Sequence, residues 1–442
     1  MSDQRWRGGD SRASGKRSWR DDSSRNNDYE GRHRGERRAN YRAPAQQQQR
    51  NPNEPRGLRF RVPRADDLQR QDQRCTLSKP TEIGHFSKYG DGEIRFDRSN
   101  LLRYKEPAVG VNLLHGIENY VPKEELDPDA HPAPIAPVLA ALEHFQAMQQ
   151  QQETDKSPHF VTFRNNLNKI MGVQNETEPS LYTPYNTSSE WTFLAEKRDG
   201  CMYLDVRRTQ SDVDGSRNMH ENQKRGMYAG RQFEIFCTHG KDAANIHSSE
   251  ASDEEAEKPD SERVVNENEE YCGLFSTTLS GKRLVVAAEI DCFDGAAATA
   301  AAMEDQHYVE LKTFRVLQRE KDTFVFERFK LLAFWIQSFV VGIPKIVCGF
   351  RNDDFEICKL QTFKTTDIPS FCRKYWSPTV CLNFTSSFLD WLYAEAQEGK
   401  VYQATYSPRA HAIDMVELLE SNGSSKSARS FLVPGPGSSQ AE

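Results

Sequence analysis

The sequence predicts an α+β (or α/β) fold in which helices flank a mixed β-sheet core, between two disordered tails. Short apolar runs typical of strands alternate along the central chain with segments whose apolar residues recur at helix spacing. The two ends are polar by contrast. A mean hydropathy of −0.79 and a hydrophobic content of 36% fit a chain that folds over only part of its length.

Composition divides the chain into three segments. Residues 1–75 are rich in Arg, Gly, Ser, Asn and Gln and are expected to be a disordered tail; residues 76–420 form the folded domain, and residues 421–442 a second tail. Residues 1–64 carry 17 Lys and Arg against 8 Asp and Glu, although the whole chain has a net charge of −7. The first tail therefore fits either a weak RNA-binding or targeting arm or a simply solvated segment.

Cysteine use and hydropathy point to an intracellular protein without a membrane segment. The nine cysteines show neither CxxC pairs nor the Cys/His spacing of a zinc site, so we expect reduced thiols. The polar start lacks the apolar core of a signal peptide. The longest apolar run, residues 329–343, is interrupted by Lys330 and Gln337 and is too short to span a bilayer.

Strands are predicted where apolar residues alternate between turn signals. Two short strands flank a Gly-Asp-Gly turn within residues 82–96, and residues 191–206 form a hairpin that turns at Asp199-Gly200. Residues 271–279 and 283–292 pair through a Ser280-Gly281 turn. Further strands are expected at residues 232–237, 308–314 and 345–350.

Helices are predicted from apolar residues at helix spacing and from their stop signals. They cover residues 134–149, 160–171, 324–341 and 385–398, the third closed by Gly342 and Pro344 and the last by Gly399. The Ser/Asp/Glu-rich residues 240–270 are expected to be an exposed acidic insertion rather than a site. The alanine-rich residues 295–302 are a connector.

The chemistry concentrates in residues 284–315. Glu289 and Asp291 end one apolar run, and Glu310 and Lys312 stand inside another. Residues i and i+2 of a strand share a face, so two such strands side by side in one sheet would gather three carboxylates and a lysine. That set suits a divalent-metal site that cleaves phosphodiesters.

A plainer interpretation of these charges is available. Glu289 and Asp291 could lie on a solvated face, with Lys312 in an ordinary cross-strand pair. Ionised carboxylates beside apolar strands are costly unless something compensates for them, and Mg²⁺ or Mn²⁺ would do so. The two tripeptides by themselves leave both interpretations open.

In the metal interpretation, two divalent cations bridged by Asp291 and its neighbouring acids bind the scissile phosphate and lower the pKa of the attacking water. Lys312 orients the water or stabilises the developing charge. The order of an acid followed by ExK resembles the PD-(D/E)XK superfamily of restriction-nuclease-like enzymes.

Three further motifs narrow the resemblance. They are Phe163-Arg164 on a predicted helix, the GxxxE motif ending at Glu234 in a predicted strand, and Gln337 in an apolar helix. In this order, and with flanking text such as EIGHFS, FVTFR and YVELKT, the chain resembles the decapping exoribonuclease family over about residues 80–400. That family includes fungal partners of the nuclear 5′→3′ exoribonuclease. The resemblance favours the metal interpretation.

The resemblance implies a role for each site residue. The metal ligands are Glu234, Glu289, Asp291, Glu310 and the backbone carbonyl of Leu311. Lys312 and Gln337 contact the scissile phosphate and the water, and Glu289 also borders the substrate. RNA is held by Phe163, Arg164, Asn165 and Cys272, and its backbone by Arg95 or Arg103. Phe163 departs from the tryptophan common in relatives, and Cys272 could equally be a small buried thiol.

The implied activity is metal-dependent hydrolysis at RNA 5′ ends. It includes removal of incomplete or NAD caps, release of pyrophosphate from 5′-triphosphate RNA and 5′→3′ degradation of 5′-monophosphate RNA, in a monomeric nuclear protein. One alternative is a protein whose main role is to bind and stabilise a nuclear 5′→3′ exoribonuclease. A weaker alternative is a DNA nuclease. Comparing cleavage of single-stranded RNA and of DNA of the same sequence would distinguish the two, because contacts to the 2′-OH chiefly separate them.

Overall fold

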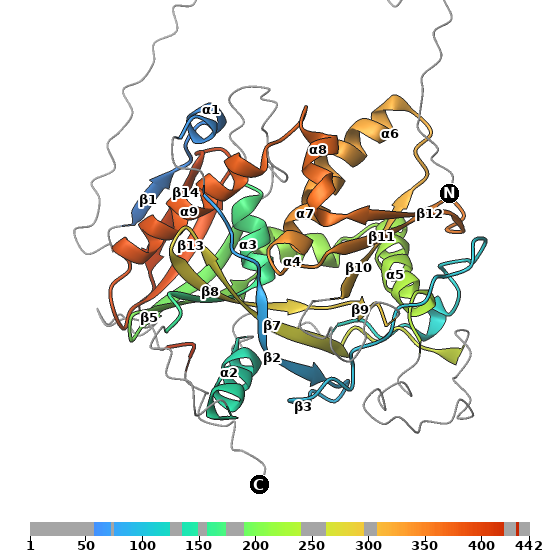
Figure 1. Ribbon diagram of the computed structural model, residues 1–442, viewed down its shortest axis with the longest axis horizontal. Coiled ribbons are helices and arrows are strands. Elements are labelled where there is room, and N and C mark those ends of the chain that lie inside the picture. The colour runs from blue at the N-terminus through green and yellow to red at the C-terminus, as the bar shows by residue number, and fades with distance from the viewer. Residues whose placement is uncertain are drawn as a thin grey trace, which may run out of the picture. The chain divides into compact units, whose positions relative to one another are not determined.

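The strands form two sheets, one of ten strands and one of four (Figure 1). The computed structural model describes residues 57–71, 75–123, 135–148, 157–173, 190–239, 262–295, 307–419 and 430–432. Both sheets contain parallel and antiparallel neighbours. The predicted class, mixed strands flanked by helices, is confirmed, but the single predicted sheet is wrong.

The large sheet places the strand of the ExD motif near its middle. Strand β4 is parallel to β6 and β8, and the other neighbouring strands are antiparallel. In spatial order the strands are β1 (Leu58–Arg61), β14 (Ala412–Glu417), β13 (Val401–Ser407), β5 (Trp191–Arg198), β6 (Cys201–Arg207), β4 (Phe160–Phe163), β8 (Lys282–Glu289), β7 (Glu270–Leu279), β2 (Thr81–Lys88) and β3 (Ile94–Arg95).

The small sheet holds the ExK motif. Its order is β12 (Ile357–Lys364), β11 (Lys345–Arg351), β10 (Tyr308–Arg315) and β9 (Cys292–Phe293). Strands β10 and β11 are parallel, which requires a crossover connection, and the helical segment between them supplies it. That segment consists of α6 (Glu320–Val325), a π-helical turn at Phe326–Lys330 and α7 (Leu331–Phe339).

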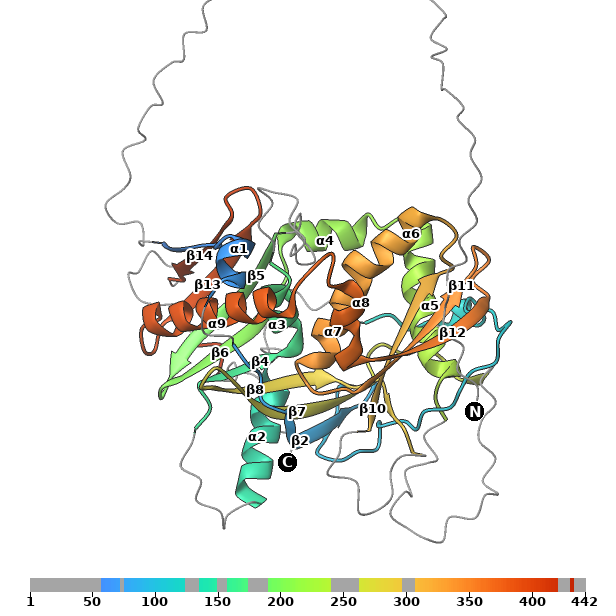
Figure 2. The ribbon, with the colours of Figure 1, turned by 45° about the horizontal axis from the view of Figure 1, so that its top comes forward.

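Helices cover the sheets in layers (Figures 1 and 2). Helix α2 (Ala136–Met148) packs on the outer face of the large sheet, whereas α3 (Arg164–Met171), α7 and α9 (Pro378–Glu395) share the main core with its inner face. Helix α5 (Glu221–Phe236) covers the far face of the small sheet. Because β8 is covered on both faces, Val285 and Val286 point into different cores.

The remaining helical segments are short. They are α1 (Ala65–Gln69), α4 (Gln210–Arg217), α8 (Ile368–Cys372) and 3₁₀ turns at Ile117–Asn119 and Thr365–Asp367. Both predicted two-residue hairpin turns are confirmed: Asp199-Gly200 and Ser280-Gly281 have positive φ at both positions, as tight hairpins need. The predicted helix at residues 385–398 begins earlier, at Pro378, a residue suited to a first helical turn.

Two predicted elements are wrong. Residues 160–171 divide into β4 and α3, because the first residues pair with Leu284 and its neighbours in β8 instead of starting the helix. The strand predicted at residues 232–237 is the last part of α5. There Ala229 and Phe233, four residues apart, pack against β10, so that Glu234 projects from a helix.

The predicted tails are only partly within the described residues. Strand β1 and α1 lie inside the segment assigned to the first tail, and β1 pairs with β14. Phe431, assigned to the second tail, is buried in the core beneath α2. The rest of both tails, residues 240–261 of the acidic insertion and residues 296–306 of the connector lie outside the described residues.

The cysteines and the helices bear on two expectations, namely reduced thiols and the absence of a membrane segment. All nine cysteines are free thiols, as predicted. In the part of the chain that the structure describes, no helix combines the length and the apolar character needed to cross a bilayer.

The buried Asp205 generates a stability prediction. One of its carboxylate oxygens accepts a hydrogen bond from the Val206 amide at 2.7 Å, and the backbone amides of Val206 and Ile135 are the groups that favour its ionised form. Burial raises the pKa of Asp205 to about 7. The ionised form therefore destabilises the fold, increasingly as pH rises from the unfolded pKa near 4 to about 7.

We expect Asp205→Asn to raise the free energy of unfolding by about 1–3 kcal/mol at pH 8, and by less at pH 5. Urea denaturation at both pH values measures this. Asp414→Asn, in an exposed pair with Arg59, is the control. An equal effect of Asp205→Asn at pH 5 and pH 8 would contradict the prediction.

Candidate active site

The chain itself carries the ExD motif from the large sheet to the small one. Strand β8 ends at Glu289, Asp291 follows at the crossing, and β9 pairs with β10 through Cys292 and Val309. Oδ2 of Asp291 accepts a hydrogen bond from the Leu311 amide at 2.7 Å. The acids of both motifs thus meet at the junction of two sheets, not on neighbouring strands of one.

Glu310 is fully buried at this junction and is bonded on both oxygens. Oε2 accepts from Nη1 of Arg164 at 3.0 Å, and Oε1 accepts from Nζ of Lys312 at 2.5 Å. Arg164 also donates to the backbone carbonyls of Glu289 at 2.9 Å and Gln337 at 3.4 Å. One guanidinium therefore ties α3, the end of β8, β10 and α7 together.

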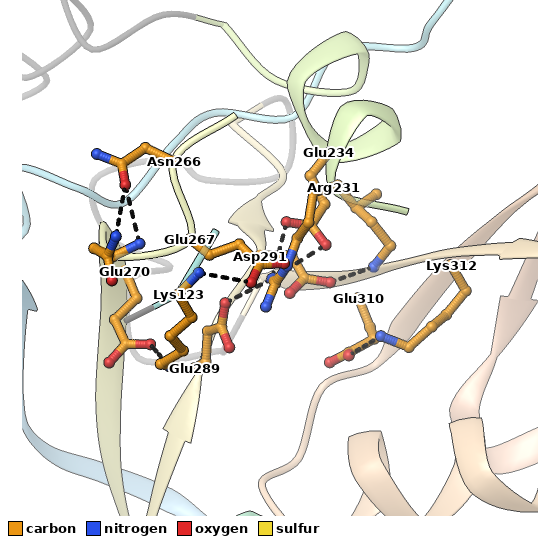
Figure 3. Close-up of polar contacts among 12 residues, drawn as sticks. Lys123, Arg231, Glu234, Asn266, Glu267, Glu270, Glu289, Asp291, Glu310 and Lys312 are labelled. Atoms are coloured by element: carbon orange, nitrogen blue, oxygen red, sulfur yellow. Dashed lines mark hydrogen bonds and ion pairs between the residues drawn. The ribbon is translucent and has the colours of Figure 1, made fainter. Parts of the chain in front are cut away.

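Glu234 enters the cluster from α5, together with Arg231 one turn before it. Nη1 of Arg231 lies 2.9 Å from Oε1 of Glu289 and 3.3 Å from Oε2 of Glu234 (Figure 3). Nε of Arg231 lies 3.4 Å from Oε1 of Glu267. Beside this group, Lys123 pairs with Glu270 at 3.2 Å.

The carboxylates divide into two electrostatic classes. Nearby cations, Arg231 for Glu289 and Lys312 for Glu310, hold these pKa values below the usual range although desolvation opposes them. Desolvation, with repulsion from the other carboxylates, raises the pKa of Glu234 to about 8 and that of Asp291 to about 7. Burial lowers the pKa of Lys312, but Glu310 and Asp291 together raise it above its usual value, so Lys312 stays cationic.

The donor set fits a divalent cation. Five carboxylates, those of Glu234, Glu267, Glu289, Asp291 and Glu310, face the three cations Arg164, Arg231 and Lys312. With all five carboxylates ionised, the cluster is short of two positive charges, the charge of one Mg²⁺ or Mn²⁺, and its ligands are the hard oxygens that both ions prefer. Glu234, Glu289, Asp291 and Glu310 are the residues that would hold the metal.

The carboxylates do not, however, enclose an ion as they stand. Among the described residues no three Asp, Glu, His or Cys side chains converge on a point suited to a metal. Their oxygens are directed at Arg231, Lys312 and Arg164 instead. Metal binding therefore requires some of these carboxylates to exchange an internal cation for the metal.

A cavity of about 500 Å³ opens beside the acids. Residues 262–270 form much of one wall, so the end of the predicted acidic insertion belongs to the site, and the prediction that it is not a site is wrong there. The lining comprises Asn100, Leu102, Arg231, Glu234, Ile235, Thr238, Glu262, Arg263, Val264, Val265, Asn266, Glu267, Glu269, Glu270, Tyr271, Glu289, Ile290 and Asp291.

The remaining predicted site residues differ in their burial and in their position relative to the acids. Phe163 is half-buried at the end of β4, and Asn165 is exposed on the first turn of α3. Cys272 is buried and lies opposite Glu289 in the β7–β8 register. Burial raises the pKa of its thiol well above the usual range. Contacts of these residues, and of the Leu311 carbonyl and the Gln337 amide, with metal or RNA stay predictions.

The two candidates for the RNA backbone occupy different places. Arg103 forms a bridge with Phe293 of β9, beside the acids, whereas Arg95 lies on the edge strand β3 and pairs with Glu93 at 2.9 Å. Position therefore favours Arg103.

Sequence reasoning missed Arg231 and Glu267. Arg231 stands inside the GxxxE motif, but the strand predicted there hid its helical i, i+3 relation to Glu234. Glu267 belongs to the segment interpreted as an insertion. A helix assignment for residues 221–236 would have revealed the first of them.

Residues 78–434 match the family model described as RAI1-like PD-(D/E)XK nuclease. The chain belongs to this nuclease family. The predictions of family and of enzyme class, a phosphodiester-cleaving nuclease, are thereby confirmed.

Relatives of the RAI1-like family include animal and fungal proteins. The Xenopus laevis decapping and exoribonuclease protein is 31% identical over 327 residues, which are 70% of this chain and 74% of the relative. The Neurospora crassa decapping nuclease RAI1 is 28% identical over 355 residues, which are 78% of this chain and 79% of the relative.

Solved structures agree on the fold. The crystal structure of Candida albicans Rai1 in complex with pU5-Mn²⁺ has a TM-score of 0.66 at 22% identity and covers 82% of this chain and 93% of its own. The crystal structure of Schizosaccharomyces pombe Rai1 has a TM-score of 0.61 at 23% sequence identity, and the match covers 82% of this chain and 100% of the Rai1 chain.

Arg164 should be essential for stability. Arg164→Met leaves the buried Glu310 with Lys312 alone, and we expect it to lower the free energy of unfolding by about 3 kcal/mol. Urea denaturation measures the loss. Arg59→Met, which breaks the exposed pair with Asp414, should cost less than about 1 kcal/mol. Similar losses in the two variants would refute the assignment.

The affinity of the site for a divalent metal should decrease as the pH is lowered. Glu234 and Asp291, with pKa values of about 8 and 7, hold protons below those values, and a metal must displace them. We expect Mn²⁺ to bind at least about tenfold more weakly at pH 6 than at pH 8, by calorimetry. Affinity that does not change between these pH values would show that neither proton competes with the metal.

Proposed function

We propose that this chain is a divalent-metal-dependent hydrolase that acts at the 5′ ends of RNA. One observation carries the proposal: Glu289 and Asp291 meet Glu310 and Lys312 beside a cavity, at the junction of two sheets. The substrate class, RNA 5′ ends, is inferred from the relatives, which are named decapping nuclease and decapping and exoribonuclease protein.

The residues of the chain divide the catalytic work. When bound, a divalent metal lowers the pKa of the attacking water and stabilises the leaving oxygen. Lys312, kept cationic by Glu310, supplies an N–H donor for a phosphate oxygen or for the water. Arg164 fixes Glu310, and its bond to the Gln337 carbonyl fixes the part of α7 that presents the Gln337 amide. The partly enclosed cavity limits water around the reacting bond.

The finer substrate assignment rests on the family resemblance. It comprises removal of incomplete or NAD caps, release of pyrophosphate from 5′-triphosphate RNA and 5′→3′ degradation of 5′-monophosphate RNA. One metal-assisted attack near the first nucleotide serves all three. We propose two Mg²⁺ or Mn²⁺ ions, by analogy with two-metal nucleases; the carboxylates balance the charge of one ion, and the phosphates of a bound RNA would balance that of the other.

Location and partners are proposed on the same basis. A nuclear monomer that also binds a nuclear 5′→3′ exoribonuclease is what the resemblance implies. Because the acids lie inside the cavity, substitution of Glu289 and Asp291 should leave such binding intact, which a co-purification assay measures.

The double variant Glu289→Gln/Asp291→Asn should lose at least about 1,000-fold in hydrolysis, because metal ligands and charge are removed with little change in shape. The assay uses Mn²⁺ and end-resolved RNAs with monophosphate, triphosphate, cap, NAD and hydroxyl ends. DNA of the same sequence tests the preference for RNA.

The matched control is Asp414→Asn/Glu417→Gln, the same chemical change on β14, which is separated from β8 by several strands. It should retain full activity. Hydrolysis by the site double variant at the unaltered rate would refute the proposed function, whereas equal cleavage of DNA would refute only the substrate class.

A further inference from the structure

Arg231 bonds the side-chain carboxylates of two proposed metal ligands that come from different elements. Its Nη1 lies 2.9 Å from Glu289, at the end of β8, and 3.3 Å from Glu234 on α5. The side chain is 29% exposed, so it borders the cavity and is not locked in the core. Figure 3 shows it reaching between the two carboxylates.

The guanidinium is held asymmetrically. Its Nε edge bonds Glu267, which comes from the cavity wall and is not among the proposed ligands. Its Nη1 faces the two ligands. Loss of the bonds to Glu234 and Glu289 would therefore leave Arg231 anchored at the site, so release of these carboxylates need not expel it.

A guanidinium and a divalent metal use the same carboxylate lone pairs. Arg231 satisfies and partly neutralises Glu234 and Glu289, in a partly desolvated site where each charge interacts strongly. A metal that binds these oxygens must break both contacts, and it must also approach a fixed positive charge. Both effects weaken metal binding.

We propose that Arg231 is a built-in counter-ion that competes with the divalent metal for Glu234 and Glu289 and thereby sets the affinity of the site. This inference rests on the proposed function, because it takes these acids as metal ligands. Arg231 is a positioning residue in this scheme: it acts through the two carboxylates, and its anchor Glu267 keeps it within reach of them.

Lys123 provides the matched comparison. It lies in the same group and pairs with Glu270, which is not a proposed ligand, while its charge is felt by Glu289. Lys123→Gln and Arg231→Gln both remove one positive charge near the acids. Direct competition is lost in Arg231→Gln alone.

The experiment is calorimetric titration of Mn²⁺ into the full chain at pH 8 after removal of metals with EDTA. Arg231→Gln should tighten Mn²⁺ binding about tenfold, and Lys123→Gln less than about threefold. Thermal unfolding gives an independent readout: Arg231→Gln should be less stable than the unaltered chain in EDTA, and Mn²⁺ should raise its Tm more.

Unchanged or weaker Mn²⁺ binding by Arg231→Gln, or the same change as in Lys123→Gln, would overturn the inference and leave Arg231 as a structural support. No Mn²⁺ binding by the unaltered chain would overturn both the inference and the metal site. If Arg231→Gln does not fold, Arg231→Lys replaces it: one ammonium reaches fewer of the three acids, so binding should tighten by about threefold, and unchanged binding would overturn the inference.

Discussion

The bonds between Glu310, Arg164 and Lys312 are the constraint on which the rest of the structure depends. A carboxylate with no exposed surface stays ionised at little cost only when its oxygens are paired with charged donors, and for Glu310 the donors come from α3 and from β10 itself. Arg164 extends the connection to the carbonyls of Glu289 and Gln337. Arg164 of α3 therefore fixes the end of β8, β10 and α7 relative to one another, at the junction where the acids lie.

The surrounding electrostatics follow from this junction. Glu310 and Glu289 are matched by cations, and Asp291 and Glu234 are left with raised pKa values. When all of its acids are ionised, the cluster is short of two positive charges and therefore favours a divalent cation. The arrangement divides the four proposed metal ligands into two whose ionised form is stabilised by cations and two whose ionised form is disfavoured.

Arg231 and residues 262–270 give this chain a feature that the motifs alone do not describe. The wall of the cavity supplies Glu267, which anchors a cation next to two of the proposed metal ligands. A site built in this way can remain internally paired when metal is scarce. In the proposed scheme, the metal affinity of the site then depends on Arg231, which is not itself a proposed metal ligand.

The sequence by itself determined the class of the fold, the hairpins and the identity of the acids, because these depend on local alternation, turn chemistry and charge placed in apolar runs. Glu289, Asp291, Glu310 and Lys312 could be named from spacing, and the order of motifs identified the family. The tertiary structure decided that the two motifs lie in separate sheets, that Glu234 projects from α5 and that Arg231 stands between the acids. Residues 160–163 and 232–236 show the physical reason. Their apolar spacing suits either element, and only pairing with β8 or packing on β10, both distant in the chain, selects one.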